Sequence, residues 1–147
     1  MEKIAVIGAG QMGNGIAQVA ASAGYEVLMI DIKEEYVDRG MATIQKSLSK
    51  LVSKERISQS DADDTLARIS TTTDRAECAD VDLVVEAVPE ILDLKTSIFS
   101  ELDEICKPEC ILASNTSSIS ISTIANATNR PEKVIGMHFM NPVPIRK

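Results

Sequence analysis

The order of apolar and polar residues predicts short strands that alternate with longer helices. Six short apolar runs, most of them rich in β-branched residues, are predicted as strands: 3–7, 26–30, 69–73, 82–88, 111–114 and 134–138. Stretches with helical spacing lie between them: 12–23, 33–54, a short one opening at 60–61, 93–106 and 121–127. Because successive βαβ units connect through right-handed crossovers, we expect an α/β fold of Rossmann type. Its sheet would be mostly parallel and doubly wound, with helices on both faces.

Composition narrows the classes of function. The chain has 147 residues, 44% of them hydrophobic and 25% charged, which suits one folded domain. A net charge of −7 disfavours nucleic-acid or anionic-membrane partners. No apolar run is long enough for a membrane span or a signal segment, so a cytoplasmic protein is expected. Cys78, Cys106 and Cys110 form no C-x-x-C pair and are predicted to be buried thiols, with no metal site.

A Gly-Ala-Gly-Gln-Met-Gly segment matches G-x-G-x-x-G directly after a predicted strand and at the start of a predicted helix. In this context Gly8 permits a tight turn, Gly10 lets the backbone approach a pyrophosphate, and Gly13 lets the helix pack closely. The amides at the helix start, at Gln11 and Met12, would then face the phosphates. The alternative is a glycine-rich turn that binds no ligand.

Asp31 ends the second predicted strand, where an acidic side chain can accept hydrogen bonds from the ribose of adenosine. This position favours NAD over NADP, because a 2′-phosphate would bring two anions into contact. Lys33 would offset part of that repulsion, so NADP stays open. Capping of the following helix is a second role open to Asp31.

Polar segments follow the fourth, fifth and sixth predicted strands, at the sheet edge where doubly wound proteins bind ligands. His138 is the one histidine of the chain, and imidazole can take a proton from an alcohol near neutral pH. A hydroxyl such as that of Ser117 would bind the same substrate oxygen. Each residue type alone is more often structural, but their shared placement on one rim favours a site for hydride transfer.

Several segments together resemble the amino-terminal domain of the 3-hydroxyacyl-CoA dehydrogenases. They are the glycine motif with Asp31, Val88-Pro89-Glu90, Lys95-Thr96-Ser97, Ser114-Asn115-Thr116-Ser117-Ser118 and His138-Phe139-Met140-Asn141-Pro142-Val143-Pro144. The resemblance covers essentially the whole chain. It implies an oxidoreductase of fatty acid and butanoate metabolism that transfers a hydride between NAD and C3 of a short-chain 3-hydroxyacyl-CoA.

The resemblance also implies roles for individual residues. His138 corresponds to the catalytic base, Ser117 to the contact with the substrate hydroxyl and with both ligands, and Asp31 to the ribose ligand. Further positions line the family's NAD site: Glu90, Lys95, Asn115 and Asn141. Ser47 and Lys54 correspond to positions that contact CoA, and their spacing returns them to one helix face. Without the resemblance, an ordinary solvated helix face would be the simpler reading of that surface.

Two parts of the family pattern have no match in this sequence. In the family, a further strand carries a glutamate that orients the histidine, and a helical carboxyl-terminal domain completes the substrate site and most of a homodimer interface. The sequence given stops at Lys147. We therefore expect residues 1–147 to be an NAD-binding domain truncated within its last strands, which binds NAD with little or no turnover.

Two other functions stay open. A stand-alone NAD(H)-sensing regulatory module would share the length, the glycine motif and the acidic residue, but it does not account for the segments around Ser117 and His138. The cofactor domain of a β-hydroxyacid dehydrogenase, which acts on free acids, is the second. Reduction of a 3-ketoacyl thioester would argue against both.

Overall fold

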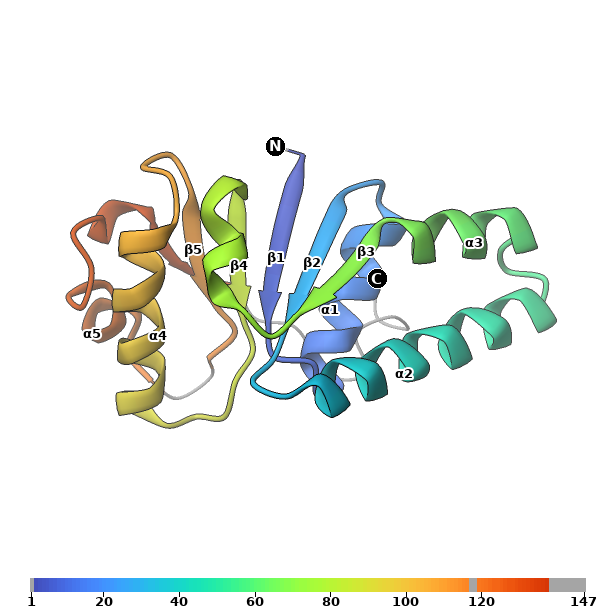
Figure 1. Ribbon diagram of the computed structural model, residues 1–147, viewed down its shortest axis with the longest axis horizontal. Helices are drawn as coiled ribbons and strands as arrows, with labels where there is room; N and C mark the ends of the chain where they lie inside the picture. Colours follow the sequence, from blue (N-terminus) through green and yellow to red (C-terminus); the bar gives the residue numbers. More distant parts are fainter. Residues whose placement is uncertain (1, 117–118, 138–147) are drawn as a thin grey trace.

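A computed structural model describes residues 2–116 and 119–137. Its six strands form one parallel sheet in the order β3-β2-β1-β4-β5-β6 (Figure 1). The strands are β1 (Lys3–Ile7), β2 (Glu26–Ile30), β3 (Ile69–Thr72), β4 (Leu83–Glu86), β5 (Ile111–Ser114) and β6 (Val134–Gly136). The helices are α1 (Gln11–Ser22), α2 (Glu34–Ser53), α3 (Gln59–Ala67), α4 (Leu92–Ile105) and α5 (Ile121–Ala125), with 3-10 turns η1 (Arg75–Asp80) and η2 (Pro131–Lys133). The predicted doubly wound α/β fold is confirmed.

Each face of the sheet has its own hydrophobic core. Ile4 and Val6 of β1 pack with residues of α1, α2 and α3. Ala5 and Ile7, which alternate with them along the strand, pack with residues of η1, α4 and α5 on the opposite face. Because both faces are covered, the strands are apolar at successive positions rather than at every second one.

Most observed elements begin or end within two residues of the predicted bounds, and the following differences have a structural reason or were not predicted. The third helix begins at Gln59 rather than at 60–61, because Ser58 is the N-cap and forms a capping box with Asp61. β4 is shorter than the predicted strand 82–88, ending at Glu86. The turn η1 was not predicted; the side chain of Asp74, which accepts a hydrogen bond from the amide of Ala76 at 2.9 Å, caps it.

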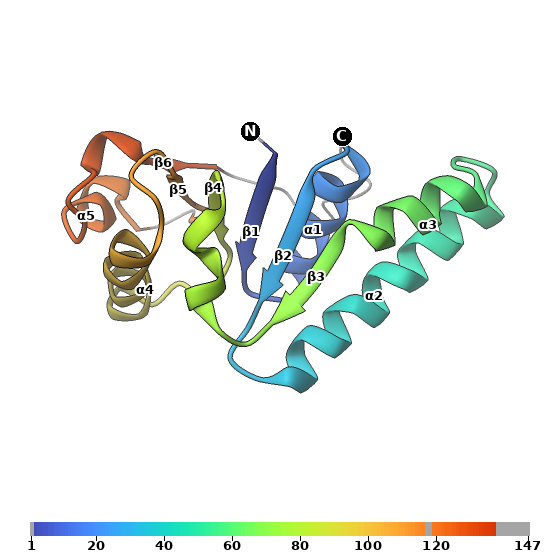
Figure 2. The same ribbon diagram turned by 45° about the horizontal axis from the view of Figure 1, so that its top comes forward.

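Helices α2 and α3 run side by side and extend beyond the edge of the sheet (Figure 2). At its beginning α2 lies against the β1–α1 loop, where Gly40 makes the approach possible: a Cβ at this position would lie 2.9 Å from the carbonyl oxygen of Ala9. The glycine therefore serves helix packing next to the loop that carries the glycine motif. None of the helices in the described part of the chain is long and apolar enough to cross a membrane.

The end of α4 is held by one buried arginine. The Arg130 guanidinium donates to the carbonyl oxygens of Asp103, Cys106, Lys107 and Cys110 at 2.7–3.1 Å, and its Nε donates to the Asp103 carboxylate at 2.7 Å. All five of its N–H groups are thereby used. The three cysteines are buried free thiols, as predicted, and burial raises the pKa of the Cys78 thiol to about 12.

Candidate functional site

The turn between β1 and α1 depends on its glycines. Gly8 has a φ of +111°, and a Cβ there would lie 2.8 Å from the carbonyl oxygen of Ala87 in the β4–α4 loop. At Gly13 a Cβ would lie 1.8 Å from the carbonyl oxygen of Gly8, so the helix packs directly on the turn. Nothing lies within 4 Å of a Cβ built on Gly10. The glycine loop therefore presents open space at Gly10 and tight packing on either side.

The first turn of α1 offers unsatisfied amides to that open space. Its N-cap is Gly10, which has no side chain to accept from them, and no acidic side chain lies in the first turn. The amide of Asn14 closes the first intrahelical bond by donating to the Gly10 carbonyl oxygen at 2.8 Å. The amides before it, at Gln11 to Gly13, combine with the helix dipole to favour an anion such as a phosphate.

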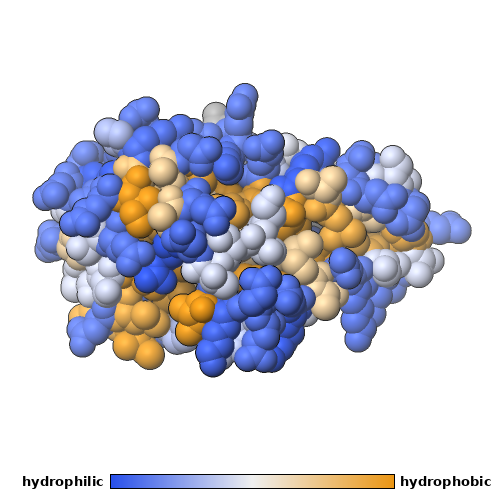
Figure 3. Space-filling model, viewed as in Figure 1, coloured by the Kyte–Doolittle hydropathy of each residue, from blue (hydrophilic) through white to orange (hydrophobic). Residues whose placement is uncertain are grey.

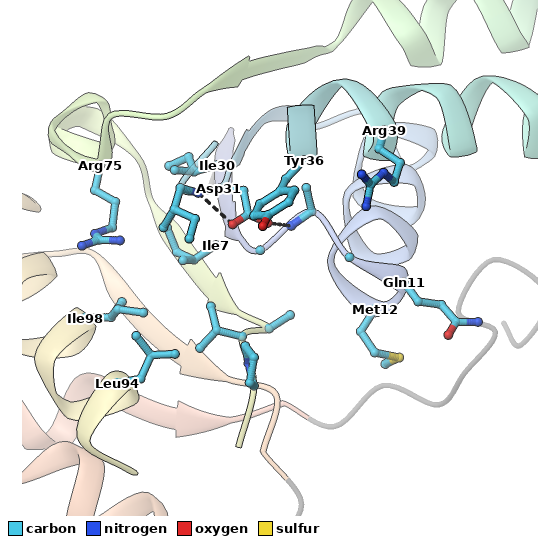
Figure 4. Close-up of a pocket in the computed structure, with 17 residues that line it drawn as sticks. Ile7, Gln11, Met12, Ile30, Asp31, Tyr36, Arg39, Arg75, Leu94 and Ile98 are labelled. Atoms are coloured by element: carbon cyan, nitrogen blue, oxygen red, sulfur yellow. Dashed lines mark hydrogen bonds between the residues drawn. The ribbon is translucent and has the colours of Figure 1, made fainter. Parts of the chain in front are cut away.

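Asp31 connects the end of β2 to the glycine loop. Its Oδ2 accepts from the amide of Ala9 at 2.8 Å, and its Oδ1 accepts from the amide of Ile32 at 2.7 Å (Figure 4). The capping alternative is not observed, because the N-cap of α2 is Lys33 and has no side-chain cap. The carboxylate is half-buried and lines a cavity, where its remaining lone pairs are available to a ligand.

A cavity of about 620 Å³ lies between the glycine loop, the end of β2 and the beginning of α4. Figure 4 shows Arg75 at one end of the cavity and Gln11 and Met12 at the other. The walls are mainly apolar: Ile7, Ile30, Ile32, Val88, Leu94 and Ile98. An apolar slot with a few polar groups at its ends is the usual form of a small-molecule site.

Sequence reasoning did not identify the cationic and aromatic residues of this cavity. Arg75 is held by Glu101, with Nε 2.7 Å from Oε1, and this ion pair lowers the pKa of the Glu101 carboxyl. On the opposite side the Arg39 guanidinium lies 5.8 Å from the ring centroid of Tyr36. Tyr36 and Arg39 are three residues apart on one predicted helix, and this spacing could have indicated that their side chains lie on the same helix face.

Exposed apolar side chains lie in the cavity wall at Ile32 and at the beginning of α4, close in sequence to the lining residues Pro89 and Leu94. Ile32 is 68% exposed, and at the beginning of α4 Ile91 and Leu92 are 55% and 42% exposed. In Figure 3 apolar side chains gather at the lower left, where α4 begins. Their exposure beside a cavity is typical of a surface that a ligand or another segment covers.

A charged cluster lies at the carboxyl ends of β4 and β5, and we call it the Glu86–Lys95–Glu90 cluster. The ammonium Nζ of Lys95 lies 2.5 Å from Oε2 of Glu86 and 3.1 Å from Oε1 of Glu90, and it donates to the Val88 carbonyl oxygen at 3.3 Å. Glu86 and Lys95 are fully buried. Register pairs Glu86 with Ser114, whose hydroxyl donates to Oε1 at 2.5 Å.

The β5 loop joins the same cluster. The amide of Asn115 donates to the Glu86 carbonyl oxygen at 2.8 Å, and the Thr116 hydroxyl donates to Oε2 of Glu90 at 2.6 Å. The structure thus brings Glu90, Lys95 and Asn115 together, as three predicted residues at one rim. At that rim the Lys95 ammonium donates hydrogen bonds to Glu86 and to the Val88 carbonyl oxygen and forms an ion pair with Glu90.

The remaining predicted residues fall in two groups. Ser117, His138 and Asn141 lie outside the described residues. Ser47 lies on α2, and Lys54 is the C-cap of that helix. Neither residue lines the cavity. Ser47 is half-buried and its hydroxyl accepts from Nε2 of Gln18 at 3.0 Å, whereas Lys54 is exposed.

Residues 3–147 match the family described as 3-hydroxyacyl-CoA dehydrogenase, NAD binding domain. A relative from Deinococcus radiodurans, named probable 3-hydroxybutyryl-CoA dehydrogenase, is 56% identical over 144 residues that cover 97% of this chain and 51% of the relative. The Bacillus subtilis protein of the same name is 46% identical and is covered over 51% of its length by the whole of this chain. The crystal structure of (S)-3-hydroxybutyryl-CoA dehydrogenase from Ralstonia eutropha has a TM-score of 0.96 and 44% identity, over 99% of this chain and 51% of the other. The chain spans about half the length of the curated relatives it matches.

Proposed function

The chain belongs to the 3-hydroxyacyl-CoA dehydrogenase family as its NAD-binding domain, and we propose that it holds NAD along the carboxyl edge of the sheet, from the end of β2 to the end of β5. The whole protein would oxidise a short-chain 3-hydroxyacyl-CoA, and the similarity to 3-hydroxybutyryl-CoA dehydrogenases favours a four-carbon acyl group.

The residues present fit NAD. The open space at Gly10, in front of the first amides of α1, is the observation that carries the proposal, since a pyrophosphate needs a backbone it can approach. Asp31 would accept hydrogen bonds from the ribose hydroxyls of the adenosine half. The apolar walls formed by residues such as Ile32 and Leu94 would enclose the adenine.

NAD, when bound, supplies the hydride acceptor for oxidation of the C3 hydroxyl. We propose that His138 takes the proton of that hydroxyl, because imidazole exchanges protons near neutral pH, and that Ser117 donates a hydrogen bond to the same oxygen. Both roles rest on the family resemblance. Asn115 and Asn141 are proposed to complete the wall on the β5–β6 side.

The CoA moiety is proposed to lie along α2. The ammonium of Lys54 is exposed and would attract a phosphate, and Lys50 and Lys46, about one and two turns earlier, are also exposed. The hydroxyl of Ser47 accepts from Gln18 and keeps its own O–H for a ligand. Ser117 would lie between this substrate and the cofactor.

Calorimetric titration of the 147-residue chain tests the cofactor proposal. We expect saturable binding of NAD⁺ with one site, and at least roughly tenfold weaker binding of NADP⁺, because its 2′-phosphate would meet the Asp31 carboxylate. Absence of heat with millimolar NAD⁺ and NADH, for a chain whose circular dichroism shows it to be folded, would contradict the proposal.

Oxidation of NADH in the presence of acetoacetyl-CoA tests the catalytic proposal. We propose that the 147 residues assayed alone show little or no turnover, because the family places part of the substrate site in a second domain. A fusion of this chain to the second half of the Deinococcus relative should restore turnover, and His138→Gln should abolish it again. Activity of the fusion with 3-hydroxyisobutyrate but not with the thioester would instead favour a β-hydroxyacid dehydrogenase.

A further inference from the structure

The Arg75 guanidinium lies at the end of the cavity opposite Gln11 and Met12 (Figure 4). In that view the Arg75 side chain points from η1 toward Ile98 and Leu94, which belong to the apolar wall. A guanidinium offers only hydrogen-bond donors and keeps its proton near neutral pH. A ligand group that reaches this end of the cavity is therefore expected to be flat and apolar on its faces and to accept hydrogen bonds at its edge.

The backbone holds Arg75 close to Asp31. Register pairs Ile30 at the end of β2 with Thr72 at the end of β3, and the amide of Asp31 donates to the Thr72 carbonyl oxygen at 3.4 Å. The turn η1 begins shortly after this pair. Its N-cap, Asp74, is held from both sides, because its amide donates to the Thr72 hydroxyl at 3.1 Å and its carboxylate caps the turn. Arg75 therefore extends from a well-anchored turn beside the proposed ribose ligand.

Glu101 fixes the orientation of the guanidinium. Its Oε1 accepts from Nε of Arg75 at 2.7 Å and its Oε2 accepts from Nη2 at 3.2 Å, so the pair is bidentate. These two bonds occupy one edge of the guanidinium. Within residues 2–116 and 119–137, both N–H groups of Nη1 and the second N–H of Nη2 have no hydrogen-bond partner. The Arg75 side chain is 27% exposed, so these donors are accessible to a ligand in the cavity.

The placement of NAD proposed above brings the adenine to this end of the cavity, and the inference rests on that proposed function. With the pyrophosphate at the first amides of α1 and the ribose at Asp31, the base lies beyond Asp31, away from the glycine loop. Residues such as Ile32 and Leu94 would cover the faces of the ring, so Arg75 would meet its edge. Of the ring nitrogens of adenine that can accept a hydrogen bond, N1 is the farthest from the bond to the ribose.

We propose that Arg75 recognises the base of the cofactor by donating a hydrogen bond to N1 of the adenine, with Glu101 as the positioning residue that holds the guanidinium. A donor in a partly dehydrated slot loses affinity for any ring that offers no acceptor at that place, because it gives up water without a replacement. Arg75 is thus a specificity-determining residue at the adenosine end, distant from the reacting nicotinamide.

ADP and two analogues that differ from it at one ring position test the proposal in the 147-residue chain. In 1-deaza-ADP a C–H group replaces N1, and in 7-deaza-ADP a C–H group replaces N7. We expect calorimetry to give a dissociation constant roughly tenfold higher for 1-deaza-ADP than for ADP, because the Arg75 donors lose their acceptor. The 7-deaza analogue should bind as ADP does.

Arg75→Met removes the guanidinium and keeps an unbranched side chain. We expect the affinity for ADP to fall roughly tenfold, to that for 1-deaza-ADP, while the affinity for 1-deaza-ADP stays the same, so that the difference between the two ligands disappears. Arg56→Met, at an exposed arginine, is the matched control and should keep the ratio of the two dissociation constants found for the unsubstituted chain.

Glu101→Gln provides a second test, since one of the two acceptor oxygens becomes an amide nitrogen and the bidentate grip on Arg75 is lost. The ratio should decrease without reaching equality. If Arg75→Met does not fold, Glu101→Gln decides alone, and an unchanged ratio there would overturn the inference. Equal binding of ADP and 1-deaza-ADP by the unsubstituted chain, or an equal loss of affinity for all three ligands in Arg75→Met, would also overturn it. An unsubstituted chain that binds neither ADP nor NAD⁺ would instead contradict the proposed function itself.

Discussion

The two halves of the sheet contribute different kinds of chemical groups to the candidate site. On the β1–β3 side the site consists of backbone and apolar surface: a glycine loop, the first amides of α1 and the cavity walls, with Asp31 tied to the loop by backbone hydrogen bonds. On the β4–β6 side it consists of polar side chains, the Glu86–Lys95–Glu90 cluster with Ser114. This half of the molecule also holds a second buried polar group outside the site, Arg130 at the end of α4.

This difference determines which kind of substitution should destabilise each half. A structure made of closely packed backbone has no room for an added methyl group, because main-chain atoms cannot move aside cheaply. A structure made of buried polar groups is instead destabilised when one partner is removed, because the other partner is left buried and unpaired. Substitutions chosen on this basis separate folding from ligand binding.

The largest effect is expected from Gly13→Ala in the β1–β3 half. The new Cβ would lie 1.8 Å from the Gly8 carbonyl oxygen, so the helix must move away from the turn. We expect a loss of at least about 3 kcal/mol in the free energy of unfolding, and loss of NAD⁺ binding with it. Urea denaturation followed by circular dichroism measures the first quantity. An unfolding free energy within about 1 kcal/mol of the original would contradict this account of the packing.

Arg130→Met is the corresponding change in the β4–β6 half. It leaves the Asp103 carboxylate and four carbonyl oxygens at the end of α4 without their donor. We expect a loss of about 3–5 kcal/mol of unfolding free energy, measured in the same denaturation series. Arg56→Met, at an exposed arginine, is the control and should change it by less than about 0.5 kcal/mol. Similar losses in both variants would show that Arg130 has no special structural role.

Gly10→Ala separates binding from folding within the β1–β3 half. Its φ of −70° suits alanine, and nothing lies within 4 Å of the added Cβ, so the unfolding free energy should hardly change. The methyl group would occupy the space proposed for the pyrophosphate, and we expect the NAD⁺ affinity to fall roughly a hundredfold, by about 2.7 kcal/mol. Calorimetry with NAD⁺ measures the loss. Unchanged affinity would show that no phosphate lies at this glycine.

Asp31→Asn should have the smallest effect of the four. An amide oxygen can still accept from the Ala9 amide, but it binds ribose hydroxyls more weakly than a carboxylate does. We expect roughly tenfold weaker NAD⁺ binding and a narrower preference over NADP⁺, because the repulsion of the 2′-phosphate is removed. Asp38→Asn, at an exposed aspartate of α2, should leave both affinities unchanged. A preference over NADP⁺ that survives Asp31→Asn would assign the discrimination to other residues.

The β1–β3 half was largely predictable from sequence because its signals are local. The glycine motif and Asp31 stand at fixed distances from strand ends, and the bounds of β1 and β2 agree with the predicted runs. The start of α3 was misplaced because Ser58 and Ser60 are both acceptable N-caps, and only the capping box with Asp61 distinguishes them.

The β4–β6 half was less predictable because its partners come together only in the tertiary structure. Glu86 follows an apolar run and gave a usable signal, since a charged residue in a buried strand requires a partner. The identity of that partner depends on the register of β4 with β5 and on the turn of α4 that brings Lys95 back to the sheet. Arg75 was missed for a similar reason, because η1 has no periodicity that marks it.

Amide chemical shifts of the ¹⁵N-labelled chain, followed during titration with NAD⁺, test the central claim most directly. We expect the largest changes at Ala9 to Met12, at Asp31 and at Asn115, which lie along one edge of the sheet. Residues of α3 should show none. Shifts confined to another surface, or none at saturating NAD⁺, would contradict the claim that a dinucleotide lies along this edge.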